Sequence, residues 1–140
     1  METTTQLKKS KSLNIALWIV QGVLAFLFLM AGFMKSTTPI DKLATMLPWT
    51  KDAPLLLVRF IGISELLGGL GLLLPSILRI KPVLTPIAAT GLTIIMILAT
   101  FFHISKGEYN AIGMTILFGL IAVFIAWGRF KKVPIQSKKR

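Results

Sequence analysis

An apolar run of 20 residues, from Leu55 to Leu74, constrains the fold of this chain more than any other segment because it contains two charged residues. A helix of that length spans a hydrocarbon core of about 30 Å. Arg59 lies four residues inside the run, and Glu65 falls near its middle. An ionisable side chain at the centre of a bilayer costs about 2.5–3.5 kcal/mol on insertion scales, so such groups normally face other helices or a water-filled cavity. The sequence therefore predicts a membrane protein with a buried polar centre.

Three further apolar runs have about the length of a bilayer, and the composition agrees with them, since 54% of the residues are hydrophobic and the mean hydropathy is +0.78. Soluble domains of this size are rarely so apolar. We therefore expect an all-α fold, a membrane four-helix bundle that occupies residues 14–127 as one domain. The expected spans are residues 14–34, 55–74, 83–102 and 110–127.

A short amphipathic segment separates the first two spans. Its apolar residues follow the i, i+3, i+4, i+7 spacing of one helix face, which predicts a short helix lying in the membrane interface. Thr38 is expected to cap this helix, with Pro39 in its first position and Pro48 after its end. The residues of the face are Ile40, Leu43, Ala44 and Leu47.

Two prolines near the second and third spans predict local effects on those helices. Pro75 is expected to end the second span, and Pro86 is expected to distort the entry into the third, because proline lacks the backbone N–H that a helix interior requires.

The distribution of basic residues predicts the orientation. Eleven Lys and Arg residues lie in the N-terminal segment 1–13, the turn at 75–82 and the tail 128–140, against five on the opposite side. The positive-inside rule therefore places both termini in the cytoplasm, with the protein in the cell membrane. The net charge of +11 is accounted for by these flanking segments, so we do not expect a nucleic-acid partner.

With that topology, four polar residues are predicted to gather at the outer mouth of the bundle: Lys35, Arg59, His103 and Asn110. Glu65 is expected about 9 Å deeper than Arg59, since an α-helix rises 1.5 Å per residue. We take Glu65, Arg59, Lys35 and His103, together with Gln21, as candidates for a ligand or proton site.

Glu65 is not expected to pair with Arg59 inside its own helix. A separation of six residues turns the helix by about 600°, which leaves the two side chains about 120° apart in direction. The carboxyl group should therefore be protonated or bridged to another helix, and Gln21, Thr90 and Thr93 lie at compatible depths. Two roles remain open for Glu65: a hydrogen bond that fixes the fold, or a proton or headgroup site.

Small residues in the second span are predicted to permit close helix packing. Gly62 and Gly69 lie near the Glu65 face, while Ser64, Gly68 and Gly71 form a second strip. Alternatively, these residues leave space for a flat ligand or a lipid tail beside Glu65.

The chain contains no cysteine and one histidine, so we expect no metal site. It also carries no motif that would hold a flavin, haem or nucleotide. A quinone or lipid is compatible with the polar site, but no cofactor is expected to be held covalently or by a motif.

The pattern of these residues resembles the DoxX-like family of small integral membrane proteins over roughly residues 14–130. The residues that carry the resemblance are Arg59, Gly62, Glu65, Gly69, Leu72 and Pro75 in the second span, Gly32 and Lys35 at the end of the first, and Phe102 and His103 at the exit of the third. The resemblance implies a four-helix fold and a membrane location. Its matched polar positions are Lys35, Arg59, Glu65 and His103.

The family takes its name from a subunit of a thiosulfate:quinone oxidoreductase, and its wider group includes assembly factors for membrane proteins. The resemblance thus implies an accessory or quinone- or lipid-binding subunit, with a partner in a membrane or redox complex besides the bilayer. A homo-oligomer is also compatible with the sequence. The alternatives are an assembly or scaffold factor without a small-molecule ligand, and a membrane-embedded oxidoreductase or small transporter.

Overall fold

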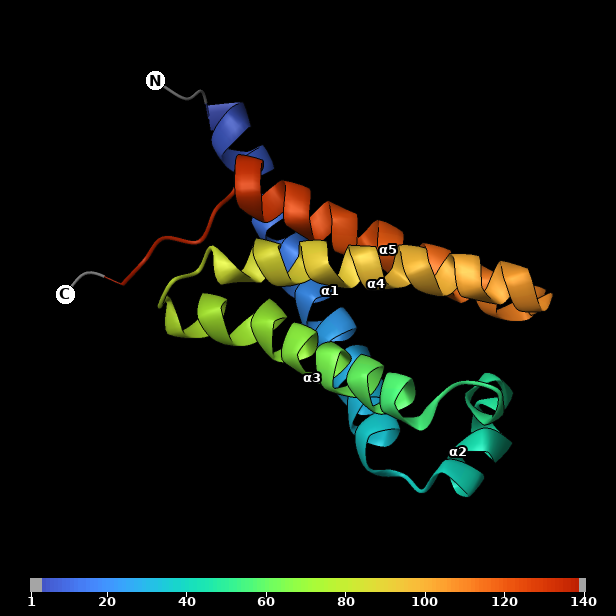
Figure 1. The fold of residues 1–140 in the computed structure, drawn as a ribbon. Coiled ribbons are helices and arrows are strands. Elements are labelled where there is room, and N and C mark those ends of the chain that lie inside the picture. The colour runs from blue at the N-terminus through green and yellow to red at the C-terminus, as the bar shows by residue number, and fades with distance from the viewer. Residues whose placement is uncertain (1–3, 139–140) are drawn as a thin grey trace.

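The computed structural model describes residues 4–138, and over this range the chain is all-α (Figure 1). Four of its helices are long and apolar enough to cross a membrane. The elements are α1 (Thr4–Thr37), α2 (Ile40–Met46), η1 (Pro48–Lys51), α3 (Leu55–Leu78), α4 (Leu84–Lys106), α5 (Tyr109–Trp127) and η2 (Gly128–Lys132). The four-helix membrane fold predicted from the sequence is confirmed.

The long helices form two pairs that are joined through α3 and α4. α1 packs mainly against α3, α4 packs mainly against α5, and α3 contacts α4. Figure 1 shows that α3 and α4 lie close together at the turn that connects them and diverge toward the end of the molecule occupied by α2 and η1. We call that end the α2 end, and we call the opposite end, where both ends of the described chain lie, the basic end.

Glycines bring α1 and α3 close together. A Cβ atom on Gly32 would lie 2.6 Å from the carbonyl oxygen of Gly62, and one on Gly62 would lie 2.8 Å from the backbone nitrogen of Ser36. Gly69 similarly faces α1, where its Cβ would meet Leu29 at 2.8 Å. The face of α3 that carries Glu65 therefore packs against α1 at nearly backbone distance, which is the close approach that small residues permit in membranes.

The second strip of small residues faces α4 for part of its length. Added Cβ atoms would lie 2.5 Å from the Leu92 side chain at Gly68 and 2.6 Å from Ala88 at Gly71. Ser64 lies one turn nearer the α2 end, and there its side chain lines a cavity. The strip therefore packs where α3 and α4 converge and borders empty space where they diverge.

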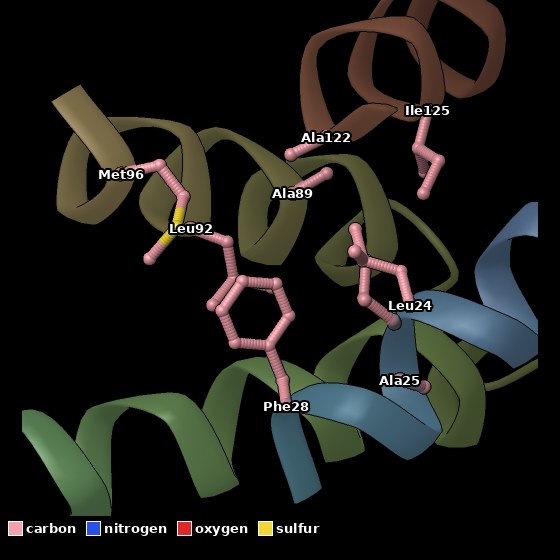
Figure 2. Close-up of a cluster of buried hydrophobic side chains, with 9 residues drawn as sticks. Leu24, Ala25, Phe28, Ala89, Leu92, Met96, Ala122 and Ile125 are labelled. Carbon is pink, nitrogen blue, oxygen red and sulfur yellow. The ribbon is translucent and has the colours of Figure 1, made fainter. Parts of the chain in front are cut away.

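The apolar core ties the two helix pairs together (Figure 2). Phe28 points from α1 toward Leu92 on α4, while Leu24 points toward the side of α5 that carries Ile125. Phe28 also stacks edge-on with the ring of Phe118, at 5.9 Å between ring centroids. The buried cluster consists of Leu24, Ala25, Phe28, Leu72, Ala89, Leu92, Met96, Ala122 and Ile125.

The outward faces of the long helices are apolar as well. Large side chains such as Phe26, Leu67, Phe101 and Leu120 are more than 60% exposed in the isolated chain. A helix that is apolar all round belongs in a hydrocarbon environment. These faces are the surface that contacts lipid.

The short helix forms between the first two spans, but its predicted cap is wrong. α2 begins at Ile40 with Pro39 as its N-cap residue, and no side chain caps it. Thr38 instead directly follows α1, and its backbone N–H donates to the carbonyl of Met34 in the last turn of that helix. Leu43 is fully buried, so the apolar face is turned inward as its spacing indicates.

The prediction that Pro75 ends the second span is also wrong, whereas the distortion expected at Pro86 stays a prediction. Pro75 lies inside α3, which continues to Leu78 and ends at Arg79 in a left-handed conformation with φ of 57°. Pro86 falls in the first turn of α4, which begins at Leu84. The first backbone N–H groups of a helix have no intrahelical acceptor, so a proline there removes no hydrogen bond.

Candidate functional site

An ion pair between α1 and α3 forms the centre of the candidate site. The Lys35 Nζ atom lies 2.9 Å from Oε1 and 3.1 Å from Oε2 of Glu65. The Glu65 side chain is 2% exposed and that of Lys35 is 13% exposed. The carboxylate is therefore bridged to a neighbouring helix, which is one of the two states expected from the sequence.

Arg59 contacts the backbone of α1 at the same level. Its Nη1 atom donates a hydrogen bond of 2.8 Å to the carbonyl oxygen of Lys35, in the last turn of that helix. Carbonyls there have no intrahelical partner, and the negative end of the helix dipole attracts a cation. Arg59 thus holds the residue that pairs with Glu65 without contacting Glu65 itself.

A cavity of about 320 Å³ lies beside the ion pair, where α3 and α4 diverge. α1, η1, α3, α4 and α5 all contribute to its wall. Most of the lining is aliphatic or aromatic, and the lining residues are Lys35, Trp49, Leu57, Phe60, Ile61, Ser64, Glu65, Ile95, Met96, Leu98, Ala99, Phe102, His103 and Thr115. The volume is at the lower end of the range of small-molecule sites, which is about 300–1,000 Å³.

Aromatic rings line the mouth of this cavity. The Trp49 ring packs edge-on against Phe102 at 5.7 Å and against His103 at 6.3 Å. The Lys35 ammonium lies 5.8 Å from the centre of the Trp49 ring, within the range of a cation–π contact. η1 therefore places a tryptophan over the ion pair.

His103 reaches the cavity from the last turn of α4 and is 7% exposed. Its Nδ1 atom lies 3.7 Å from Oε1 of Glu108, and that nitrogen has no hydrogen-bond partner among the described residues. Asn110, which was expected at the same mouth, is exposed instead and does not line the cavity. The connection at 107–108 brings Glu108 near His103, but Glu108 does not line the cavity either.

Gln21 lies far from Glu65, so the prediction that it could be the partner of Glu65 is wrong. Its side-chain nitrogen donates a hydrogen bond of 2.7 Å to the carbonyl of Leu72, two turns along α3 toward the basic end. Its side-chain oxygen accepts a hydrogen bond of 2.6 Å from Nε of Arg129. Thr90 and Thr93 also do not contact Glu65, because each donates its hydroxyl hydrogen to a carbonyl of its own helix.

Arg129 forms the second polar cluster, which the sequence reading counted only as part of the basic tail. It is 3% exposed, and its Nη1 atom donates to Oδ1 of Asn14 at 2.7 Å and to the carbonyl of Val133 at 2.8 Å. The guanidinium also lies 5.3 Å from the centre of the Trp18 ring. The sequence signal for this cluster was the pair Asn14 and Gln21, which lie seven residues apart in the first apolar run. Two amide side chains on one face of that helix indicate a polar side chain opposite them, which is Arg129.

The two clusters differ in what they can hold. Neither cluster is a possible metal site, since within residues 4–138 no three His, Cys, Asp or Glu side chains come together. The Lys35–Glu65 pair borders an apolar cavity, so the N–H groups of Lys35 can meet the polar head of a lipid-soluble molecule. The described geometry fits the binding of an amphipathic ligand at the α2 end.

The fold and this site define a small membrane protein with four transmembrane helices, in which a buried ion pair adjoins an interhelical cavity. The model of the DoxX-like family matches residues 19–125. The match covers most of the chain, and the chain belongs to the DoxX-like family. No curated protein and no solved structure matches it.

Proposed function

We propose that this chain is an accessory subunit of a membrane complex that binds a lipid-soluble quinone, or a lipid, in the cavity beside Lys35 and Glu65. Both ligands share the required chemistry, which is a polar head with carbonyl oxygens attached to a long apolar tail. The observation that carries the proposal is the position of a buried ion pair in the wall of an otherwise mostly apolar cavity of about 320 Å³. Sites for small molecules commonly combine an apolar wall with a few placed polar groups.

The Lys35 ammonium is the group that would hold the head. It has three N–H donors, and Glu65 accepts hydrogen bonds from it at two oxygens. One donor is left for a carbonyl oxygen, and the Trp49 and Phe102 rings beside it offer flat surfaces for a ring or a glycerol backbone. Leu57, Phe60 and Leu98 would contact the tail, since they line the same cavity.

The role is that of an accessory subunit rather than a catalyst because the two charges neutralise each other. Glu65 is engaged at both oxygens by Lys35, so neither side chain is free to act as a base.

We place the protein in the cell membrane with both termini in the cytoplasm. This orientation rests on the excess of Lys and Arg at the basic end, where the turn at 79–83 and the residues after α5 lie.

The test is to identify what co-purifies with the full-length protein. The protein is purified in a mild detergent, extracted with organic solvent, and the extract is analysed by liquid chromatography and mass spectrometry. We expect a quinone or one lipid class at a fixed molar ratio to the protein, and its mass distinguishes the two. The matched variants are Glu65→Gln, which changes a carboxylate in the cavity wall, and Asp41→Asn, which makes the same change at an exposed position on α2.

Glu65→Gln should lose the molecule, because both Glu65 oxygens hold the Lys35 ammonium in place, while Asp41→Asn retains it. The proposal fails if the wild-type protein carries only the lipids of the bulk membrane in their bulk proportions, or if both variants retain the bound molecule equally. In that case a role as an assembly or scaffold factor without a ligand becomes the better account, and recovery of one stoichiometric protein partner would support it.

A further inference from the structure

A second hollow lies at the basic end, about one to three helix turns beyond the level of Gln21. It has a volume of about 590 Å³ and is bounded by α1, the end of α3, η2 and the segment that follows η2. It shares no lining residue with the cavity at the α2 end. The lining residues of this basic groove are Ser10, Lys11, Asn14, Trp18, Ser76, Arg79, Lys132, Val133, Pro134, Ile135 and Gln136.

The charge of the basic groove is of one sign. Lys11, Arg79 and Lys132 line it, and no acidic side chain is among its lining residues. The acidic residues of the described chain are Asp41, Asp52, Glu65 and Glu108, and none of them lines the basic groove. Within residues 4–138, the basic groove therefore has no acidic side chain in its wall that would balance its positive charge.

The wall of the basic groove is built by hydrogen bonds. Arg79 Nε donates to the carbonyl of Gln136 at 2.9 Å, and the backbone N–H of Lys138 donates to the carbonyl of Arg79 at 2.8 Å. These bonds fasten the segment after η2 onto the turn that follows α3. Arg79 adopts φ of 57°, a conformation that glycine takes more readily, and its side chain is held there by the bond to Gln136.

Arg129 lies directly behind this wall. Its Nη1 atom donates to Asn14 and to the carbonyl of Val133, both of which line the basic groove. Its Nη2 atom is buried and has no hydrogen-bond partner among residues 4–138. The guanidinium adds a fourth positive charge that is fixed in position and, within the described chain, is not balanced by a carboxylate.

We propose that the basic groove binds the phosphodiester headgroup of an anionic phospholipid. The groove lies where the transmembrane helices end, which is the depth of lipid headgroups. A phosphate would meet Lys11, Lys132 and Arg79, while Trp18, Val133 and Ile135 supply an apolar surface for the glycerol and the first carbons of the acyl chains. This apolar part of the lining is the reason to assign a phospholipid rather than a free phosphate ion.

The experiment is native mass spectrometry of the full-length protein released from detergent micelles, with phosphatidylglycerol or phosphatidylcholine of the same acyl chains added. The test variant is Lys11→Gln/Lys132→Gln. The matched control is Lys51→Gln/Lys106→Gln, which removes two exposed lysines from the α2 end. Each pair includes one lysine that lies over an aromatic ring, Lys132 over Trp127 at 5.7 Å and Lys106 over Phe102 at 5.9 Å.

We expect one phosphatidylglycerol to bind with a preference over phosphatidylcholine, and the test variant to weaken it by about fivefold per lysine, which corresponds to about 1 kcal/mol for one cation near an anionic surface. The control variant should bind as the wild type does. The inference is overturned if the two lipids bind equally, or if both variants weaken binding equally, since net charge alone would then explain the effect.

A separate titration with inorganic phosphate in lipid-free detergent overturns the assignment to a phospholipid if phosphate binds as tightly as the lipid. Circular dichroism confirms that each variant is folded, and Lys132→Gln alone serves if the double variant is not.

Discussion

The two ends of the bundle shelter charge in different ways. At the α2 end, Lys35 and Glu65 neutralise each other across α1 and α3, beside a cavity. At the basic end, Arg129 is almost as buried as Glu65, yet its hydrogen-bond partners are the neutral side chains of Gln21 and Asn14 and a backbone carbonyl. At the α2 end the buried anion is balanced by a cation, whereas at the basic end the buried cation is hydrogen-bonded only to uncharged acceptors.

This difference indicates different roles. The Arg129 cluster joins the start of α1 to η2 and, through Gln21, to the backbone of α3, so it holds three segments together. The Lys35–Glu65 pair joins only α1 and α3, which the glycine contacts already bring together. We therefore expect the Arg129 cluster to act mainly in stability and the ion pair to act mainly in binding.

The largest expected effect on stability comes from removing the partner of a buried charge. Lys35→Met removes the cation and leaves the Glu65 carboxylate 2% exposed without its partner. Breaking a buried pair in this way typically costs about 3–5 kcal/mol. The free energy of unfolding, measured by SDS titration in mixed micelles and followed by circular dichroism, should fall by an amount in that range.

The double variant Lys35→Met/Glu65→Gln is the control for that prediction. It removes both charges together, so neither is left buried without its partner. Unfolding of the double variant should therefore return to within about 1 kcal/mol of the wild type. If the double variant is as unstable as Lys35→Met, the pair is a structural element and the contrast between the ends is lost.

Arg129→Met should destabilise the protein less than Lys35→Met does. It leaves the oxygens of Gln21 and Asn14 without a donor, but these groups are uncharged. We expect a loss of about 2 kcal/mol, in the range for a hydrogen-bonded charged group. The same SDS titration checks it, and an unchanged free energy of unfolding would contradict the role of the Arg129 cluster in stability.

A smaller effect is expected from one glycine at each end. A Cβ on Gly32 would meet the backbone of α3 at 2.6 and 2.7 Å, whereas one on Gly128 would meet only the side chain of Leu17. Backbone cannot move aside, but a leucine side chain can change rotamer. Gly32→Ala should therefore cost about 1–2 kcal/mol and Gly128→Ala less than that.

Gly91→Ala is the reference substitution for both glycines, because nothing lies within 4 Å of its Cβ position. It should raise stability slightly, by up to about 1 kcal/mol, since alanine is the better helix former. If Gly32→Ala and Gly128→Ala lower the thermal unfolding temperature equally, the backbone contact between α1 and α3 at Gly32 is no more demanding than the side-chain contact at Gly128.

The fold could be read from the sequence because the hydrocarbon core imposes a length on each span. The limits of α3, α4 and α5 fall within four residues of the expected spans. The exceptions are local: Pro75 is tolerated inside α3, and α1 begins well before the apolar run from Asn14, since helix length does not depend on hydropathy.

The partner of Glu65 could not be predicted because it depends on which helices touch and in which register. The angle between Arg59 and Glu65 along one helix correctly excluded a pair between them. The choice of Lys35 over Gln21 follows from the antiparallel register of α1 and α3, which glycine contacts set and composition does not reveal. Arg129 was missed because a basic residue after an apolar run resembles an ordinary cytoplasmic flank.

The central claim is that the ion pair at the α2 end serves a ligand, and the fluorescence of Trp49 tests it most directly. Trp18→Phe/Trp127→Phe leaves Trp49 as the sole tryptophan, located in the cavity wall. The protein is titrated in lipid nanodiscs with a short-chain benzoquinone and, separately, with a phospholipid brominated on its acyl chains. Both molecules quench tryptophan.

We predict that one of the two probes quenches Trp49 saturably, and that Lys35→Met/Glu65→Gln in the same background raises its Kd by about tenfold or more, as expected for the loss of a hydrogen bond from a charged donor. Quenching that rises linearly for both probes, or a saturable curve that the double variant leaves unchanged, would contradict the account.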